Sequence, residues 1–546
     1  NYKSFKIQND KINLLNFYKN SGFKNVQIEI KEEFVKKNNR LNLYIYIDEG
    51  ERFQFRKIDF NFNKLNLDSE ITEVIISNEL KSLSKIIKKK KFYNPSVYNE
   101  SIERLTKAIY QYGKYFFKID VSERTDENYI DILFDAYSIE PKYVNSINIY
   151  GNTRTKEHVI RREITFVEGD PYNEGELSLS KRNIQKLNFF KSIEIKDKEF
   201  DNQVDLDIKV EEKSTGEFQI GVGIDSYDGA TFITGLKEKN IFGDGREVNL
   251  NIDTSSHNTI YSIGVIEPYI FNKDMDLIYD ISYAFKDRTE SKSYDLTEFN
   301  TDIGLRYDLT NKISHSFIIE YVLKDYDITG TSVSDSINKL AGNNADILID
   351  NKINYFDLDS YIRPSRGTNL QYLNILSPAT NDDNGYIKNI ITFSKYYPIK
   401  EKNIFSFKTK IGNIFSLQNK ELPIEDKFSL GGNWLRGFDR FGVGPRDSRT
   451  SYVGGRNLIA TKFDFNRPIA GSSDNPIDFN IFTDIGTVFD NKIDPTHSDE
   501  SIRASYGFGF QFYSPIGPIG FLWGFPIIKE DHDIEKMFTF SLGLTN

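Results

Sequence analysis

The part of the chain after residue 212 is a succession of segments in which every second residue is apolar. In "EFQIGVGID" the side chains of Phe218, Ile220 and Val222 fall on one side, and "LIYDISYAF" and "SFIIEYVL" repeat the pattern. The residues between the apolar ones are small or polar. A period of two is that of a β-strand with one apolar and one polar face. Because no helical periodicity interrupts it, residues 213–546 are predicted to be all β.

Two architectures alternate in this way, a soluble β-sandwich and an outer-membrane β-barrel. A sandwich of this length would be unusually large. Aromatic residues make up 14% of the chain, with 43 Phe and 32 Tyr, yet the mean hydropathy is negative. Small and charged residues on the inner face fit a polar lumen better than a dry core. Sixteen strands would have about 21 residues each with their loops, more than the roughly 9–11 that span a bilayer. The barrel is therefore favoured.

The first part of the chain repeats a mixed pattern of helices and strands. "SGFKNVQIEI", "GKYFFKIDV" and "NFFKSIEI" each follow a helical stretch and lead into a second alternating strand. The last copy has the order strand, helix, helix, strand, strand, and Asn173 and Glu176 stand at capping-box spacing before its second helix. The middle copy has the same order, whereas the first lacks its opening strand. The predicted division is given by four ranges: a partial domain at 1–50, complete domains at 51–140 and 141–212, and a barrel at 213–546.

Composition and motifs exclude several function classes. The chain has no cysteine, a formal charge of −10 and five scattered histidines. No H-E-x-x-H or G-x-S-x-G motif is present, so we expect no enzyme, no metal and no cofactor. The acidic balance argues against nucleic acid as a partner. No run reaches the roughly 18 apolar residues of a membrane-spanning helix. The N-terminus has neither an apolar core nor a Met, and we expect it to begin inside a longer precursor.

Several segments resemble the BamA family of outer-membrane β-barrel assembly factors. They occur in the family's order: "EPKYVNSINIYGNTRTKEHVIRREITFVEGDPYN", "GVGIDSYDGATFITGLKEKNIFGDGREVNLNI", "VIEPYIF", "RPSRGTNLQY", "WLRGFDRFGVGPRD", "FTDIGTVFD" and "SPIGPIGFLWGFPI". The resemblance covers nearly the whole chain. It implies α+β POTRA domains of order βααββ in the periplasm, followed by a sixteen-stranded antiparallel barrel in the outer membrane of a Gram-negative bacterium. Two departures are noted: such family members usually carry five POTRA domains, and such barrels usually end on an aromatic residue, whereas Asn546 stands last here.

The stretch "GGNWLRGFDRFGVGPR" contains the family's RGF motif at Arg436, Gly437 and Phe438. The resemblance implies that this loop folds back into the barrel and that its arginine meets an Asp-x-Gly on the inner wall, here Asp484 and Gly486. From the sequence alone, an exposed arginine without a partner is the simpler interpretation. The stretch lacks the Lys-Ser/Thr of a phosphate-binding loop, and its Asp-Arg pair breaks the RNA-binding strand signature.

A closed barrel also requires its first and last strands to pair. These are predicted at 216–224 and 538–546. The residues singled out are Gly216, Phe218, Ile220, Gly221 and Gly223 in the first, and Phe538, Phe540, Leu542 and Leu544 in the last. The glycines weaken side-chain packing, which lowers the cost of parting, or they merely relieve crowding at a bend. The resemblance implies a lateral gate that adds client strands by β-augmentation.

The expected function is assembly and insertion of β-barrel proteins into the outer membrane. The expected partners are unfolded barrel clients, accessory assembly lipoproteins on the POTRA domains, and outer-membrane lipid. Strands such as 143–150 or 205–210 could offer POTRA edges for pairing, although ordinary sheet is the simpler role. An autotransporter-assembly relative and a two-partner secretion pore remain alternatives within the superfamily, and a passive porin is a further class.

Overall fold

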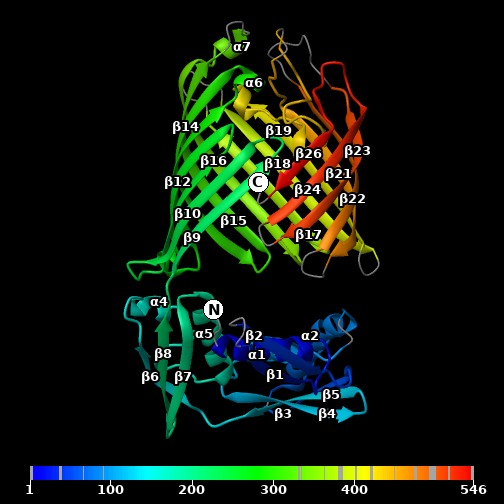
Figure 1. Ribbon diagram of the computed structural model, residues 1–546. Helices are drawn as coiled ribbons and strands as arrows, with labels where there is room; N and C mark the ends of the chain where they lie inside the picture. The colour runs from blue at the N-terminus through cyan, green and yellow to red at the C-terminus, as the bar shows by residue number, and fades with distance from the viewer. Residues whose placement is uncertain are drawn as a thin grey trace. The chain divides into compact units, whose positions relative to one another are not determined.

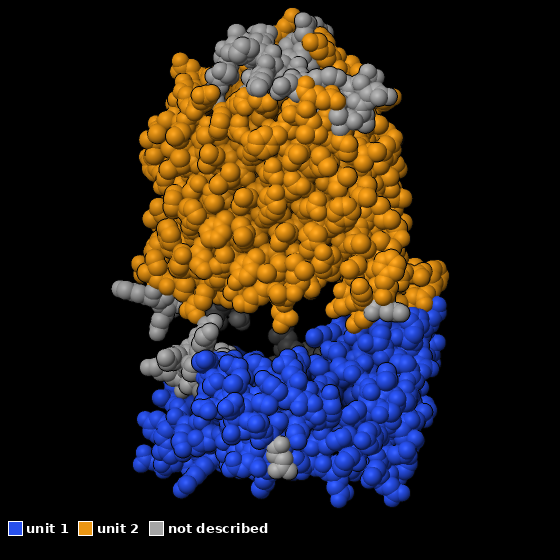
Figure 2. Space-filling model, turned by 180° about the vertical axis from the view of Figure 1, so that it is seen from behind, with its two compact units in different colours: residues 1–214 blue, residues 215–546 orange. Residues whose placement is uncertain are grey.

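The computed structural model divides into two compact units, residues 1–214 and 215–546 (Figures 1 and 2). The described residues are 4–35, 40–65, 67–89, 92–329, 333, 335–361, 363–378, 385–399, 403–418, 422–447, 449, 451–471, 476–490, 500–514 and 517–542.

The first unit opens with one helix and two strands. Helix α1 (Ser4–Asn20) precedes strands β1 (Gln27–Val35) and β2 (Arg40–Asp48), which form an antiparallel two-stranded sheet. Leu43 to Ile47 of β2 are all exposed.

The second module contains all five elements of the repeat. They are β3 (Gln54–Lys64), α2 (Ser69–Lys89), α3 (Ser96–Tyr110), β4 (Phe117–Asp126) and β5 (Tyr129–Ser138). The strand order is β3-β5-β4, with β3 parallel to β5. Alternate residues of β5, from Ile130 to Ala136, face the helices and form a core with Leu83, Leu105 and Ile109. One apolar face of the sheet thus covers the apolar stripes of both helices.

The third module repeats this fold. Its elements are β6 (Tyr143–Tyr150), α4 (Glu157–Arg161), α5 (Glu174–Lys186), β7 (Phe190–Phe200) and β8 (Gln203–Glu212), with strand order β6-β8-β7. Asn173 caps α5, since its side chain accepts a hydrogen bond from the backbone N of Gly175 at 2.7 Å. The βααββ order is confirmed. The suggestion that residues 205–210 offer a free edge is wrong, because β8 is the middle strand and pairs on both sides.

A carboxylate at the end of β8 holds the loop that follows β6. Glu212 accepts hydrogen bonds from the hydroxyl of Thr153 at 2.7 Å and from the backbone N of Arg154 and Thr155 at 3.0 and 2.7 Å. Burial opposes the charged form, but these donors outweigh it and hold the pKa of Glu212 below its ordinary value. The contribution of Glu212 to loop stability is therefore complete above the ordinary Glu pKa and is lost as the pH falls through the lowered one.

We expect Glu212→Gln to loosen this loop by about 1 kcal/mol, because a charged acceptor is replaced by a neutral one. Hydrogen exchange at the amides of Arg154 and Thr155 should quicken about five-fold at neutral pH. Protection in the parent chain, corrected for intrinsic exchange, should decline below about pH 4. Glu211→Gln, which removes the neighbouring exposed carboxylate, is the control. Equal exchange in both variants would contradict this role.

The second unit is a closed barrel of sixteen strands, each antiparallel to its neighbours (Figure 1). Its strands in order are β9 (Gly216–Asp225), β10 (Gly229–Ile241), β11 (Arg246–Thr254), β12 (Asn258–Glu267), β13 (Asp276–Asp287), β14 (Tyr294–Thr310), β15 (Ile313–Ile328), β16 (Gly342–Leu358), β17 (Gly367–Ser377), β18 (Tyr386–Ile399), β19 (Asn403–Ser416), β21 (Asn457–Gly471), β22 (Pro476–Phe489), β23 (Arg503–Ser514), β24 (Gly517–Ile528) and β26 (Phe538–Leu542). The predicted fold class is confirmed.

Short elements lie in the connections of the barrel. They are η1 (Ile270–Asn272), α6 (Thr289–Lys292), α7 (Asp335–Asn338), η2 (Ile424–Asp426), η3 (Gly432–Trp434), β20 (Gly437–Phe438) and β25 (Glu535–Lys536). β20 and β25 pair with each other as a separate two-stranded sheet.

The barrel wall alternates as the sequence requires. On β13, Tyr279, Ile281 and Tyr283 are exposed on the outer face, while Asp280 lies between the first two on the inner face. Buried inward-facing residues of other strands include Ser406, Asp464, Asp478 and Asp484. The polar residues therefore face a lumen and the apolar ones face outward, as in outer-membrane barrels. Among the described residues, no helix combines the length and apolar character needed to cross a bilayer.

Candidate functional site

The connection between β19 and β21 enters the lumen, and Arg436 is at its centre. Nε and Nη2 of Arg436 donate to the two carboxylate oxygens of Asp484 at 2.7 and 2.5 Å, and Nη1 donates to Asp464 at 2.7 Å. The backbone N of Arg436 also donates to Asp484, at 2.9 Å. The guanidinium lies 3.7 Å from the centre of the Phe482 ring. Asp484 is fully buried, so its charge depends on this fork-shaped partner for compensation.

Glycines let the loop backbone approach the wall. Gly437 has φ +98°, and a Cβ there would come within 3.1 Å of the backbone carbon of Gly524 on β24. A Cβ on Gly524 would in turn lie 2.6 Å from the backbone N of Gly437. Phe438 is completely buried beyond this contact. On β22, Gly486 leaves room for the side chain of Leu430, which would be 3.0 Å from an added Cβ. The glycines thus serve close packing inside a lumen.

A second set of buried ion pairs holds the earlier part of the loop. Glu425 accepts hydrogen bonds from Lys292, at 2.8 Å, and from the hydroxyl of Tyr294. Asp426 pairs with Lys324 of β15 at 3.0 Å. Lys292 and Lys324 are both buried. These contacts fix the loop to β14 and β15, whereas Arg436 fixes it to β21 and β22.

Residues 437–440, at the end of the RGF motif and just after it, contact the β9–β10 turn and the segment that precedes β26. Arg440 donates to Asp228, in the β9–β10 turn, at 2.5 Å. Asp439 lies 3.6 Å from Nζ of Lys536, and its backbone N donates to the carbonyl of Ile534 at 2.9 Å. Gly437 and Phe438 pair with Lys536 and Glu535 as a short antiparallel bridge just before β26. One loop therefore joins the chain next to the first strand to the chain next to the last.

The barrel closes where its last strand, β26, meets its first, β9. β9 pairs with β10 through ten residue pairs, from Gly216 to Asp225. Over the described residues, β26 pairs with β9 only at Ser541–Asp225 and Leu542–Ile224. Beyond these, the backbone N of Ser226 donates to the carbonyl of Phe540 at 3.0 Å. We call this contact between β26 and β9 the seam.

The predicted seam residues occupy the expected strands. Gly216, Phe218, Ile220, Gly221 and Gly223 lie in β9, with Phe218 and Ile220 among its outward, exposed side chains. Phe538, Phe540 and Leu542 lie in β26, whereas Leu544 lies outside the described residues. Phe538 and Phe540 pack against Trp523 and Phe521 of β24, with ring centres 5.1 and 5.2 Å apart.

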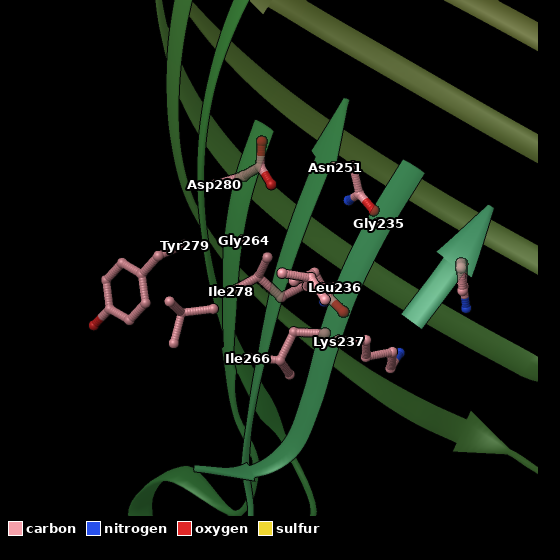
Figure 3. Close-up of a pocket in the computed structure, with 12 residues that line it drawn as sticks. Gly235, Leu236, Lys237, Asn251, Gly264, Ile266, Ile278, Tyr279 and Asp280 are labelled. Atoms are coloured by element: carbon pink, nitrogen blue, oxygen red, sulfur yellow. The ribbon is translucent and has the colours of Figure 1, made fainter. Parts of the chain in front are cut away.

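The first strands of the barrel wall contain a recess with two glycines in its lining. This recess of about 280 Å³ lies over β9 to β13 (Figure 3). Gly235 and Gly264 leave space next to Asn251 and Asp280, while Tyr279 points to the other side of β13 (Figure 3).

Sequence reasoning did not find several of these contacts. Asp464, Glu425 and Asp426 were not singled out, and Arg440 had no assigned partner. A weak signal existed for Asp464, since Lys462 and Asp464 are charged residues at inward positions of an alternating strand. For the other pairs no signal was available, because their partners lie 102 to 212 residues away.

Comparison with known proteins identifies the family. The model of the Omp85 superfamily domain matches residues 240–546, which is more than half of the chain. The chain belongs to the Omp85 superfamily. The model of the surface antigen variable number repeat, or POTRA, matches residues 59–136 and 142–213 of this Omp85 chain. Its fold is therefore POTRA repeats followed by a sixteen-stranded barrel.

Curated relatives cover most of the Omp85 chain. Outer membrane protein assembly factor BamA of Neorickettsia risticii is 26% identical over 94% of this chain and 69% of its own length. The proteins of the same name from Nitratidesulfovibrio vulgaris and Neisseria meningitidis are each 23% identical, over 91% and 99% of this chain and 62% and 73% of their own lengths. The chain thus spans about two thirds of the length of these relatives.

Solved structures share the fold of the Omp85 chain. The crystal structure of BamA from Haemophilus ducreyi lacking POTRA domains 1–3 matches 90% of this chain and 99% of its own with a TM-score of 0.69, at 21% identity. CdiB from Escherichia coli matches 99% of this chain and 98% of its own with a TM-score of 0.52, at 13% identity.

Proposed function

We propose that this chain assembles and inserts β-barrel proteins into the outer membrane of a Gram-negative bacterium, with its POTRA domains in the periplasm. The main support is the architecture, POTRA repeats followed by a sixteen-stranded barrel that closes where β26 meets β9. The printed names of the relatives, outer membrane protein assembly factors, agree with this function. A passive porin needs no POTRA repeats.

The proposed mechanism is opening of the seam as a lateral gate. Parting β26 from β9 frees the backbone N–H and C=O groups of Ile224 and Asp225 and leaves this edge of β9 open to a client strand. Inside a bilayer these groups have no water to bind, so a client strand that pairs with them is strongly favoured. The outward side chains of β9 are apolar and remain in contact with lipid during the exchange. Client strands would then add one after another.

The POTRA domains would deliver clients and bind accessory lipoproteins. We propose one partial domain at residues 1–50, complete domains at 51–140 and 141–212, and the barrel from 213. Strand β6 lies at a sheet edge, with Tyr143 and Tyr150 exposed at its two ends. An extended segment of a client or of a lipoprotein can pair with such an edge. β8 is excluded from this role by its central position.

Reconstitution tests the function directly. The chain is incorporated into phosphatidylcholine vesicles, and a urea-unfolded eight-stranded barrel is diluted into them. A client strand that enters lipid alone has unpaired backbone groups along both edges, whereas one that pairs with β9 does not. We therefore expect the protease-protected, heat-modifiable client to appear at least ten-fold faster. Vesicles that contain an equal amount of a porin serve as the control for bilayer disturbance. Equal rates in the two preparations would refute the proposed function.

A further inference from the structure

A large cavity in the barrel lumen is positively charged although the chain as a whole is not. Its volume is about 1160 Å³, and seven basic but only four acidic residues line it. The formal charge of the whole chain is −10. Basic residues are therefore concentrated on this part of the inner wall. It is formed by β16, β19, β21 and β22 together with the loop around Arg436.

The acidic residues of the cavity are already engaged. Asp478 accepts both arms of Arg363 at 2.7 and 2.8 Å, and Asp464 pairs with Arg436. Asp228 pairs with Arg440. The fourth, Asp225, accepts the backbone N–H groups of Tyr227 and Asp228 at 2.7 Å each. These carboxylates are thus committed to arginines or to the backbone.

Three lysines stand together on the same wall. Lys408 and Lys410 are alternate residues of β19, and Lys408 is directly opposite Lys462 of β21. Nζ of Lys462 donates to the carbonyl of Asn433 at 2.5 Å. Nζ of Lys410 lies 5.6 Å from the ring centre of Trp434, and Nζ of Lys408 lies 5.6 Å from that of Tyr396. Over the part of the chain that the structure describes, none of the three forms an ion pair with a carboxylate.

Three other inward-facing lysines of the barrel have carboxylate partners. Lys237 lies 2.5 Å from Glu247, Lys286 lies 2.9 Å from Glu298, and Lys324 has both Asp346 and Asp426. Lys408 and Lys462 are like charges directly opposite each other on neighbouring strands, an arrangement that disfavours the sheet. On its other side Lys462 is opposite Asp484, but that carboxylate is bound by Arg436. An anion held between Lys408 and Lys462 would remove that repulsion.

We infer that Lys408, Lys410 and Lys462 form a binding site for a phosphate-type dianion in the barrel lumen. The ammonium groups supply charge and several N–H donors, and the adjacent Trp434 ring shields one side. The dianion would be free phosphate or the phosphomonoester head of a lipid. The cavity lining continues to Thr539, Phe540 and Ser541 of the seam strand β26, so a lipid head group would enter from the seam. The site does not depend on the proposed insertion activity.

Calorimetric titration tests the site. The purified full chain, in a nonionic detergent and at constant ionic strength, is titrated with inorganic phosphate. We expect saturable binding near one equivalent, weakened at least ten-fold by Lys408→Gln combined with Lys462→Gln. Lys237→Gln, which removes an inward lysine that has its own carboxylate, should bind as the parent chain does. No saturable heat, or equal affinity in the double variant and the parent, would overturn the inference.

Two further measurements keep the test decisive. Heat-modifiable migration on a gel reports whether each variant retains its barrel, and the glutamine at 462 can still donate to the carbonyl of Asn433. If the double variant does not fold, Lys410→Gln alone should weaken phosphate binding several-fold, and an unchanged affinity there would overturn the site. Competition by micellar phosphatidate, with phosphatidylcholine as the blank, assigns the source: displacement of phosphate indicates the lipid head group, and no displacement indicates the free anion.

Discussion

A disulfide across the seam is expected to stop client insertion while the barrel stays folded. Ile224 and Leu542 are register partners on β9 and β26, so their replacement by cysteines places two thiols at cross-strand distance. The chain has no other cysteine to compete for the bond. Because the locked seam can no longer expose the edge of β9, the rate of client insertion in vesicles should fall at least ten-fold on oxidation and recover on reduction.

A matched disulfide elsewhere in the wall separates gating from general stiffening. Leu236 and Leu250 are register partners on β10 and β11, and both point outward. A bond between Leu236→Cys and Leu250→Cys joins strands that need not part, so insertion should continue at the parent rate. Undiminished insertion by the 224–542 protein in its oxidised form would rule out the lateral gate.

Loss of the Arg436 side chain is expected to destabilise the barrel by about 3–5 kcal/mol. Arg436→Ala leaves Asp484 and Asp464 without their partner, and both carboxylates are buried. The cost is mainly that of two uncompensated charges rather than the loss of hydrogen bonds. It can be measured as the fall in the free energy of unfolding in urea, with the protein in detergent micelles. Arg436→Lys keeps the positive charge but cannot donate to both carboxylate oxygens of Asp484 at once, so it should recover only part of the lost stability.

A double-mutant cycle resolves the Arg436–Asp484 contact itself. Asp484→Ala made on top of Arg436→Ala should cost less than it does in the parent chain, with a coupling of about 0.5–3 kcal/mol. Arg440→Ala breaks a more exposed ion pair with Asp228 and should cost less than about 1 kcal/mol, which makes it the comparison for a partly solvated pair. Strict additivity of the two alanine substitutions would show that the observed contact contributes no net coupling.

The fold was largely predictable because its causes are local. Strand alternation places apolar side chains outward and polar ones in the lumen whatever the register, so the pattern around Phe218 or Tyr279 was sufficient to favour a barrel. The βααββ order likewise follows from helical and strand periods within each repeat. The middle position of β8 did not follow, because a parallel partner from the start of the module is not visible in neighbouring sequence.

The site was predictable only in part. Arg436 and Asp484 were connected through the family resemblance, and the structure brings them into contact. The pairing of Asp464 with the same arginine depends on the register of β21 against the loop, which no local pattern encodes. Glu425 with Lys292 and Arg440 with Asp228 depend on the path of the loop through the lumen. Long-range charge pairs of this kind emerge only once the barrel has closed.

The loop joined to both sides of the seam also determines how the wall can move. Arg440 ties it to the turn after β9, and the bridge from Phe438 to Glu535 ties it to the segment before β26. These ties lie at the same end of β9 as its described pairs with β26, Ile224–Leu542 and Asp225–Ser541. Parting the two strands there therefore requires the loop to give up Asp228 or the bridge to Glu535 as well, so the state of the loop and the state of the seam are coupled.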